Sequence, residues 1–341
     1  NIGSLKVSFP DLMRGLFVER IEEVAVIYDL RFPRIIISML AGAAIAVSGV
    51  LFQAVLKNPL ADPGIIGISS GASFAAVLIT AFAPQLYFFT PLVAFLGGVV
   101  AFFLVYFLSW KEGLSPLRII LTGVAVDAFF TGLSSAFNSM SGGNMSGVAS
   151  IVEANITQKT WDDVTTMVPY VVAGLFLACL FIRECNLMSL EDKTVRSLGM
   201  NVNATRIVIS LIAVLLASIS TAIAGAVSFL GLIVPHIGRI LVGSDHRALI
   251  PFSALSGACF LSVAHFSLFF YGGRENMQTE NRDLKPEKMA MTVKDVSFSY
   301  GKNQILKGAS LEIPKGKITT ILGANGCGKS TLFSLMTKNL N

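Results

Sequence analysis

The sequence contains few charged residues and few residues that bind metals or form disulfides. Only 14% of its 341 residues are Asp, Glu, Lys or Arg, whereas 53% are hydrophobic, and the mean hydropathy is +0.70. Soluble domains carry roughly 25% charged residues, so this composition excludes an ordinary soluble globular protein. The four cysteines form no CxxC pair, and neither His236 nor His246 has further metal ligands beside it. We therefore expect no disulfide framework and no zinc site.

The charges that are present are unevenly distributed. Residues 1–270 contain 15 basic and 15 acidic residues, so the whole net charge of +5 comes from residues 271–341. The chain therefore divides near residue 272 into a part suited to a membrane and a part suited to water. The basic residues of the second part are spread without a recognition motif, so no nucleic-acid partner is expected.

Long apolar runs fill the first part of the chain, after a predicted periplasmic segment at residues 1–33 that lacks the apolar core of a signal peptide. A helix needs about 20 apolar residues to cross a bilayer. Eight runs qualify if the shortest is included: 34–56, 64–83, 88–110, 117–139, 165–184, 205–225, 228–243 and 250–270. With eight crossings, nine basic residues fall in the loops of one side, at 57–63, 111–118, 183–206 and 239–247. The positive-inside rule makes that side cytoplasmic, and the fold class is a mainly α polytopic transmembrane bundle over 34–270.

The last part of the chain has the pattern of a soluble α/β protein. Residues 271–291 are polar and aperiodic, which predicts a linker before a partial ATPase at 292–341. Thr292–Phe298 alternates like a strand, Ile318–Leu322 is predicted as a short buried strand, and a helix is expected to begin near Gly328.

Between that strand and that helix lies a GxxxxGK[ST] phosphate loop, in which backbone amides and a helix N-terminus hold phosphates. Lys329 would reach the β- and γ-phosphates, and Ser330 would ligate Mg²⁺. Tyr300 could stack on adenine, or it could be a core aromatic residue. The predicted ATP-binding residues are Tyr300, Gly323, Asn325, Gly326, Cys327, Gly328, Lys329, Ser330 and Thr331.

Ser297–Tyr300 followed by this loop resembles the beginning of an ABC-transporter ATPase, whose cofactor is ATP with Mg²⁺. The residues after Thr331 supply no Walker B carboxylate, signature sequence, Q-loop or switch histidine. We therefore expect neither ATP hydrolysis nor stable nucleotide binding by this segment, and the chain is not predicted to be an enzyme.

The membrane part resembles the FecCD-like, type II permeases of ABC importers for iron chelates, haem and vitamin B12. The resemblance covers about residues 1–262, and its motifs come in the family's order: Asp29–Arg34, Gly49–Gln53, Asn58–Gly64 with Ile68–Ser73, Gly231–His236 and Gly243–Arg247. It implies a multi-pass permease of the bacterial cytoplasmic membrane that moves a ferric siderophore, with haem or cobalamin as alternatives. The implied partners are a second permease copy or paralogue, ABC ATPase subunits, a substrate-binding protein and membrane lipid.

The resemblance also assigns roles to two groups of residues. Arg31 and Arg34 would meet carboxylates of the binding protein, although interfacial arginines can also simply snorkel. Leu187–Arg206 resembles the family's coupling segment, two short helices seated in a groove of the ATPase; a solvated loop is the alternative. The expected contact residues are Val195, Leu198, Gly199 and Met200, with Arg196 and Arg206 near the rim.

Three polar residues are candidates for the pathway or gate. Asn58 and Asp62 belong to the motif at 58–64, and Asp62-Pro63-Gly64 fits a helix start with Asp as N-cap. A cytoplasmic hairpin and a gating role both remain open. Asp127 lies near the middle of a predicted span, so it must face protein or water. It could line the pathway or make an interhelical hydrogen bond, while His236 and His246 are expected to be structural or coupling residues.

The sequence departs from the family in three ways. The chain begins with Asn1 in the segment before the family's second span, and after Val263 it leaves the pattern that leads to the last span. Eight spans would also return residue 272 to the periplasm, whereas an ABC ATPase is cytoplasmic. These departures suggest a fusion of adjacent permease and ATPase genes, with Met277 or Met289 as the original ATPase start. The alternatives are a non-functional hybrid and a membrane-anchored P-loop NTPase, which would need a Walker B carboxylate.

Overall fold

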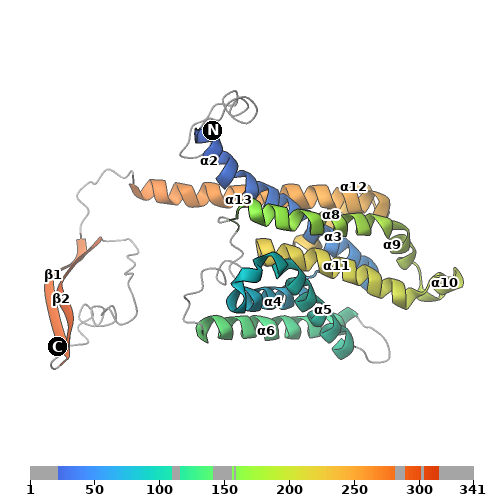
Figure 1. The fold of residues 1–341 in the computed structure, drawn as a ribbon, viewed down its shortest axis with the longest axis horizontal. Coiled ribbons are helices and arrows are strands. Elements are labelled where there is room, and N and C mark those ends of the chain that lie inside the picture. The colour runs from blue at the N-terminus through green and yellow to red at the C-terminus, as the bar shows by residue number, and fades with distance from the viewer. Residues whose placement is uncertain are drawn as a thin grey trace. The chain divides into compact units, whose positions relative to one another are not determined.

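The computed structural model describes residues 22–109, 116–140, 156, 159–280, 289–300 and 303–314. Contacts divide the chain into two compact units, Asn1–Phe269 and Phe270–Asn341. The first unit is a helix bundle (Figure 1), as expected. Its helices are α2 (Glu22–Leu30), α3 (Phe32–Leu56), α4 (Ile68–Phe82), the 3-10 turn η1 (Pro84–Phe89), α5 (Thr90–Ser109), α6 (Pro116–Met140), α8 (Trp161–Leu180), α9 (Ile182–Met188), α10 (Asp192–Ser197), α11 (Val202–Ala224), α12 (Leu230–Val242) and α13 (His246–Glu280).

All eight predicted apolar runs coincide with helices of the structure. Within the described ranges, six helical stretches are long and apolar enough to cross a membrane, while α4 and α12 are shorter. The short helices have 15 and 13 residues, and each follows a non-helical stretch, at 57–67 and 225–229. The span expected at 64–83 therefore begins late, because the chain does not enter a regular helix until Ile68.

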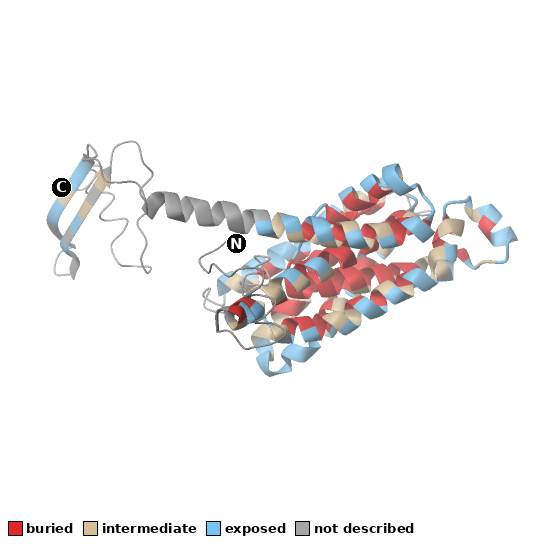
Figure 2. Ribbon diagram, turned by 90° about the horizontal axis from the view of Figure 1, so that it is seen from above, coloured by how far each residue is buried: buried red, intermediate tan, exposed pale blue. Residues whose placement is uncertain are grey.

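Helices α3 and α11 form the centre of the bundle. In each, 78% of the most apolar 18-residue stretch is buried, compared with 28–39% in the other long spans; Figure 2 shows this burial along the bundle interior. The Ser48 hydroxyl of α3 donates a hydrogen bond to the Ala213 carbonyl of α11 at 2.7 Å. Glycines let α3 approach its other neighbours: a Cβ on Gly42 would lie 2.2 Å from the Gly257 carbonyl oxygen of α13. Such close backbone contact is how small residues pack membrane helices.

Hydrogen bonds bring three of the four basic loops to one end of the bundle. The Lys57 ammonium binds the Leu190 carbonyl and the Asp192 carboxylate, and Asn186 binds Asp245 in the α12–α13 turn. Helix α13 starts at that end, and Ser262 meets Ser38 near the opposite end of α3. The connection 225–229 and α12 therefore return the chain to the basic end, as eight crossings require.

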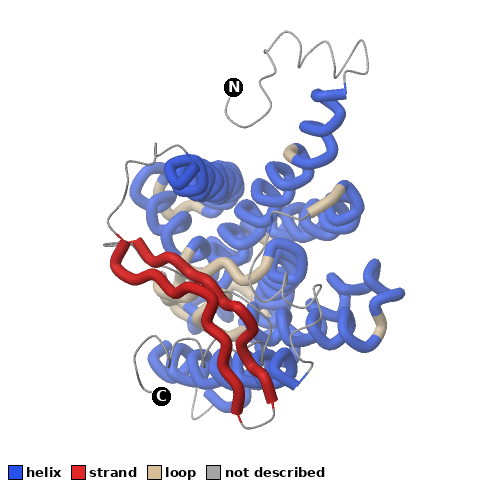
Figure 3. Tube along the Cα trace, turned by 90° about the vertical axis from the view of Figure 1, so that its left-hand side faces the viewer, coloured by secondary structure: helices blue, strands red, loops and turns tan. Residues whose placement is uncertain are grey.

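The second unit contains an antiparallel pair of strands, β1 (Met289–Tyr300) and β2 (Asn303–Pro314), drawn in red in Figure 3. The strand predicted at Thr292–Phe298 lies within β1, whereas β2 has no counterpart in the prediction. Helix α13 continues to Glu280, so the first half of the expected linker is helical. Glu275, Met277 and Gln278 are good helix formers, whereas Gly272, Gly273 and Asn276 are poor ones, so local propensity alone does not account for the difference. The strand expected at Ile318–Leu322 and the phosphate loop lie outside the described residues.

Candidate functional site

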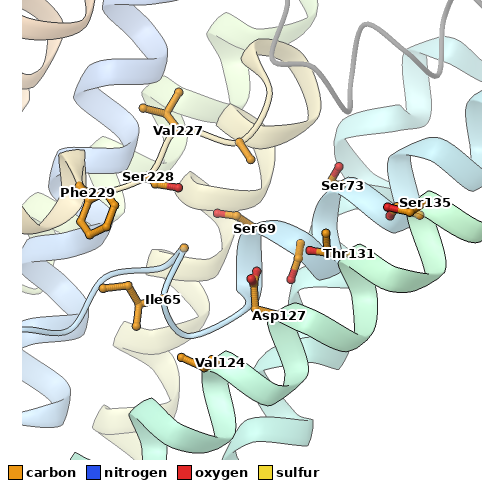
Figure 4. A pocket seen from close by; sticks show the side chains of 14 residues that line it. Ile65, Ser69, Ser73, Val124, Asp127, Thr131, Ser135, Val227, Ser228 and Phe229 are labelled. Carbon is orange, nitrogen blue, oxygen red and sulfur yellow. The ribbon is translucent and has the colours of Figure 1, made fainter.

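A cavity of about 410 Å³ lies between α4, α6 and the residues just before α12 (Figure 4). Most of its polar lining consists of hydroxyl groups, with Asp127 as the one charged side chain among the described lining residues. The hydroxyl residues are Ser69, Ser70, Ser73, Thr131, Ser134, Ser135 and Ser228, and the apolar ones are Ile65, Val124, Val227 and Phe229. Asp127 thus faces a cavity in the bundle, which is what the interpretation of Asp127 as a pathway-lining residue requires.

The serines of α4 differ in what they bind. Ser70 donates to the Gly67 carbonyl at 2.9 Å, and Ser134 of α6 donates to the Phe130 carbonyl at 3.0 Å. Ser69 and Ser73 are only 7% and 9% exposed and have no hydrogen-bond partner among the described residues. They are one helical turn apart on α4 and face the cavity (Figure 4). Their hydroxyls are therefore available to a molecule inside it.

Two breaks in helical structure make room for this cavity. Gly67 has φ +79°, which an L residue rarely adopts, and it turns the chain into α4. A Cβ on Gly123 of α6 would lie 2.8 Å from the Ile65 carbonyl oxygen, so a glycine is needed where α6 passes this turn. On the opposite wall, Gly225 and Phe229 both have positive φ around the break before α12. Non-helical backbone at membrane depth is tolerated where it lines a cavity.

Asp62 stabilises the first break from behind the cavity wall. Its Oδ1 accepts hydrogen bonds from the Gly64 amide at 2.8 Å and the Ile65 amide at 3.3 Å, and the side chain is fully buried. The Ile66 amide bonds to the Asp62 carbonyl, which closes one helical turn. Asp62 therefore caps a turn as predicted, but Gly67 ends that turn before α4 begins.

The connection 57–67 is not a simple solvated hairpin. Pro59 and Leu60 are exposed, whereas Ala61 to Pro63 are buried in the bundle. Asn58 accepts a bond from the Leu60 amide at 3.0 Å and does not line the cavity. Neither does Asp62, so of the three predicted pathway residues only Asp127 is at the cavity.

Gln53 and Arg239 join the two breaks and were not identified from the sequence. The Gln53 amide donates to the Ala61 carbonyl at 3.2 Å and to the Gly231 carbonyl at 3.1 Å, and Arg239 of α12 donates to its oxygen. Gln53 thus connects the 57–67 connection to the start of α12. A buried amide inside an apolar span was the available signal, because polar groups there need partners.

The coupling segment, residues 187–206, contains α10 and the ends of α9 and α11, so it is largely helical as expected. Met188, Val195 and Val202 form a small separate core, in which Val195 is fully buried. Val195 therefore holds the segment together and offers no surface to a partner in this conformation. Leu198 is 62% exposed, and Gly199 next to it has φ +83° with open space around it. Arg196 is also exposed and Met200 is partly buried.

A carboxylate fastens this segment to the end of α3. Asp192 forms ion pairs with Lys57 at 2.7 Å and with Arg206 at 3.3 Å, and Arg206 also donates to the Val55 carbonyl. The hydrogen bond from Lys57, followed by the charge of Arg206, holds the pKa of Asp192 below its ordinary value. Arg206 was expected near the rim of the contact with the ATPase. In the structure it instead bonds the segment to α3.

The two histidines named from the sequence differ in environment. His246 Nδ1 lies 2.7 Å from the Asn186 Oδ1, which also accepts from the His246 amide. This places His246 in the turn that adjoins α9, whereas His236 on α12 is exposed. Among the residues that the structure describes, no group of three or more acidic, His or Cys side chains could hold a metal ion.

Arg31 and Arg34 lie at the opposite end of α3 from Lys57. Both are partly buried, and the Arg34 Nε has no hydrogen-bond partner in the described part of the chain. The predicted nucleotide residues Gly323 to Thr331 lie outside the described residues, and only the backbone of Tyr300 is described, at the end of β1.

Comparisons with known proteins bear on both parts of the chain. A family model described as the FecCD transport family matches residues 1–271, and one described as ABC transporter matches residues 306–341. A protein described as "Probable heme-iron transport system permease protein IsdF" from Staphylococcus aureus strain MSSA476 is 41% identical over 262 residues, 77% of this chain and 79% of the relative. The protein of the same description from strain Newman matches to the same extent.

Among solved structures, an inward-facing transporter assigned to the metal-chelate type of ABC transporter aligns with a TM-score of 0.62. It is 28% identical and covers 72% of this chain and 80% of that one.

Proposed function

The chain belongs to the FecCD transport family, and we propose that it carries an iron chelate through the cavity between α4, α6 and residues 226–229. At the level of the family, it is a multi-pass permease subunit of a metal-chelate or haem ABC importer in the cytoplasmic membrane. The ABC transporter match covers residues 306–341. ATPase subunits are proposed as partners because ABC importer permeases work with them, as the resemblance implies.

The observation that carries the proposal is a cavity in an apolar bundle that is bordered by two helix breaks and lined by hydroxyl groups and Asp127. Transporters build substrate sites from discontinuous helices, because free backbone groups and polar side chains can then face the substrate. Here Ser69 and Ser73 offer unused hydroxyls, and Asp127 offers a carboxylate. Among the described residues, the buried Ser69 and Ser73 hydroxyls make no hydrogen bond that would give them another role.

Two further features support an ABC importer. At the basic end, exposed Leu198 and Arg196 project from a fastened segment that a partner ATPase could move. At the other end, Arg31 and Arg34 present cationic groups that suit carboxylates of a substrate-binding protein. A second copy or paralogue of the permease completes the transporter in this proposal, as the resemblance implies.

Two cargo classes are candidates. A ferric siderophore is the first. Haem is the second, favoured by the name of the relative that is 41% identical. Both are iron chelates with oxygen atoms that could accept hydrogen bonds from the serine hydroxyls: the iron-binding groups of a siderophore and the two propionates of haem.

The test is iron uptake by cells that lack their own iron-chelate permeases and that express this chain with the ATPase and binding protein of a metal-chelate importer. We expect ATP-dependent uptake of radioactive iron from a ferric siderophore or from haem. Thr131→Phe, which fills the cavity, should abolish uptake, whereas Leu255→Phe on the 75% exposed outer face of α13 should not. Uptake from neither chelate, or full uptake by Thr131→Phe, would contradict the proposal.

A further inference from the structure

The cavity carries a single sign of charge. Asp127 is the one charged side chain among its described lining residues, and no Lys, Arg or His lines it there. Arg239 of α12 is bonded to Gln53 and is not among the described lining residues. A chelate in the cavity therefore meets a carboxylate, neutral hydroxyls and apolar groups.

The position of Asp127 makes this charge effective. Its backbone lies against Gly67, at the start of α4, and its side chain projects into the cavity beside Ser69 (Figure 4). Because the surrounding walls are protein, the field of the carboxylate is screened less than in water.

The hydroxyl groups do not offset this charge. Ser69 and Ser73 can donate to or accept from a ligand, so they suit the carbonyl and N–O oxygens of a chelate without preferring an anion. Acidic side chains at the lining of a membrane pathway favour cations and disfavour anions. The cavity should consequently distinguish iron chelates by their net charge.

We infer that Asp127 selects neutral and cationic iron chelates, such as ferric trihydroxamates, over chelates with net negative charge. This inference rests on the proposed function and narrows its cargo. Hydroxamates are monoanionic, so three of them neutralise Fe³⁺. A ferric triscatecholate keeps several negative charges, and haem carries two propionates. Both anionic classes would be repelled at Asp127 as they pass.

The experiment uses one linear ferric trihydroxamate in three forms that share the same iron core. The free-amine form is cationic, the N-acetylated form is neutral and the N-succinylated form is anionic. Uptake of each is measured in the cells described above, and the result is the ratio of cationic to anionic uptake. Comparing variants with the same binding protein cancels the preference of that protein.

We expect Asp127→Asn to lower the ratio of cationic to anionic uptake by about tenfold relative to the unmodified chain, mainly by raising uptake of the anionic form; a tenfold change corresponds to about 1.4 kcal/mol. Asp127→Glu should keep the ratio of the unmodified chain. Asp162→Asn removes an exposed carboxylate on α8 that does not line the cavity and should leave the ratio unchanged.

The inference is overturned if Asp127→Asn leaves the ratio of cationic to anionic uptake unchanged or raises it. If the unmodified chain takes up neither these chelates nor haem, the proposed function itself fails. Because Asp127→Glu keeps the carboxylate, uptake by this variant shows whether loss of charge or loss of folding explains a result with Asp127→Asn.

Discussion

Gly49→Ala should destabilise the bundle because α3 and α12 touch through their backbones at this residue. A Cβ on Gly49 would lie 1.9 Å from the Gly231 carbonyl oxygen and 2.6 Å from its carbonyl carbon, so the two helices would have to move apart. Overpacking costs typically 1–3 kcal/mol, and we expect the upper end because the obstacle is backbone. The movement would also stretch the Gln53–Gly231 hydrogen bond, which contributes about 1 kcal/mol. The higher helix propensity of Ala compared with Gly offsets about 1 kcal/mol of this loss of stability.

The net loss should therefore be about 3 kcal/mol, which lowers the melting temperature by roughly 6–12 °C at about 2–4 °C per kcal/mol. The assay is loss of the helical circular dichroism signal on heating the full chain in lipid nanodiscs. Gly132→Ala is the matched control: it lies within α6 and has open space where the methyl group would go, so its melting temperature should stay the same or rise slightly. If the two variants melt within one or two degrees of each other, the close approach of α3 and α12 is wrong.

Two further predictions concern the carboxylates that hold the connection 57–67 and the coupling segment. Asp62→Ala leaves the partly buried Gly64 and Ile65 amides without this acceptor, which costs at most about 1–3 kcal/mol for each group because both line the cavity. It should lower the melting temperature, and Asp62→Asn should lower it less, whereas an unchanged melting temperature for Asp62→Ala would contradict the cap. Asp192 has a folded-state pKa lowered chiefly by Lys57, so its stabilisation is present above its ordinary pKa of about 3.9 and is lost as the pH falls through the lowered value. The measurement is hydrogen exchange of the coupling segment, corrected for intrinsic rates, which should stay slow from neutral pH down to about pH 4 and then accelerate. In Asp192→Asn the segment should exchange faster already at neutral pH. Equal exchange rates of the variant and the unmodified chain at neutral pH would contradict the ion pairs.

The helices could be predicted from the sequence, because their signal is local. Twenty or so apolar residues without charge exclude other structures in a bilayer, so each predicted run coincides with a helix. The ends of the helices were harder to predict from the sequence. Asp62 begins a helical turn, and Gly67 ends it. This break shows only in the positive φ of Gly67, which depends on the approach of α6. Beyond residue 270, the polar composition predicted a linker. In the structure α13 instead continues to Glu280.

The candidate site could be predicted only in part, because it depends on contacts between distant residues. Asp127 was identifiable as an acid inside an apolar span. Ser69 and Ser73 resemble any small residues of a packed helix, and their role appears only when residues 226–229 lie opposite them. Val195 illustrates the same dependence on distant contacts. The resemblance predicted it as a contact residue, whereas in this structure it is buried against Met188 and Val202.

The contacts define a short path between the surface expected to meet an ATPase and the wall of the cavity. Asp192 binds Lys57, the first residue of the connection 57–67, and this connection forms the cavity wall at Gly64 and Ile65. A displacement of the coupling segment would therefore reach the cavity over seven or eight residues of backbone, from Lys57 to Gly64 and Ile65. The centre of the bundle is close-packed at α3 and α11 and resists deformation. Since Gln53 ties the same connection to α12, the two helix breaks would move together, and the cavity would change shape as one unit.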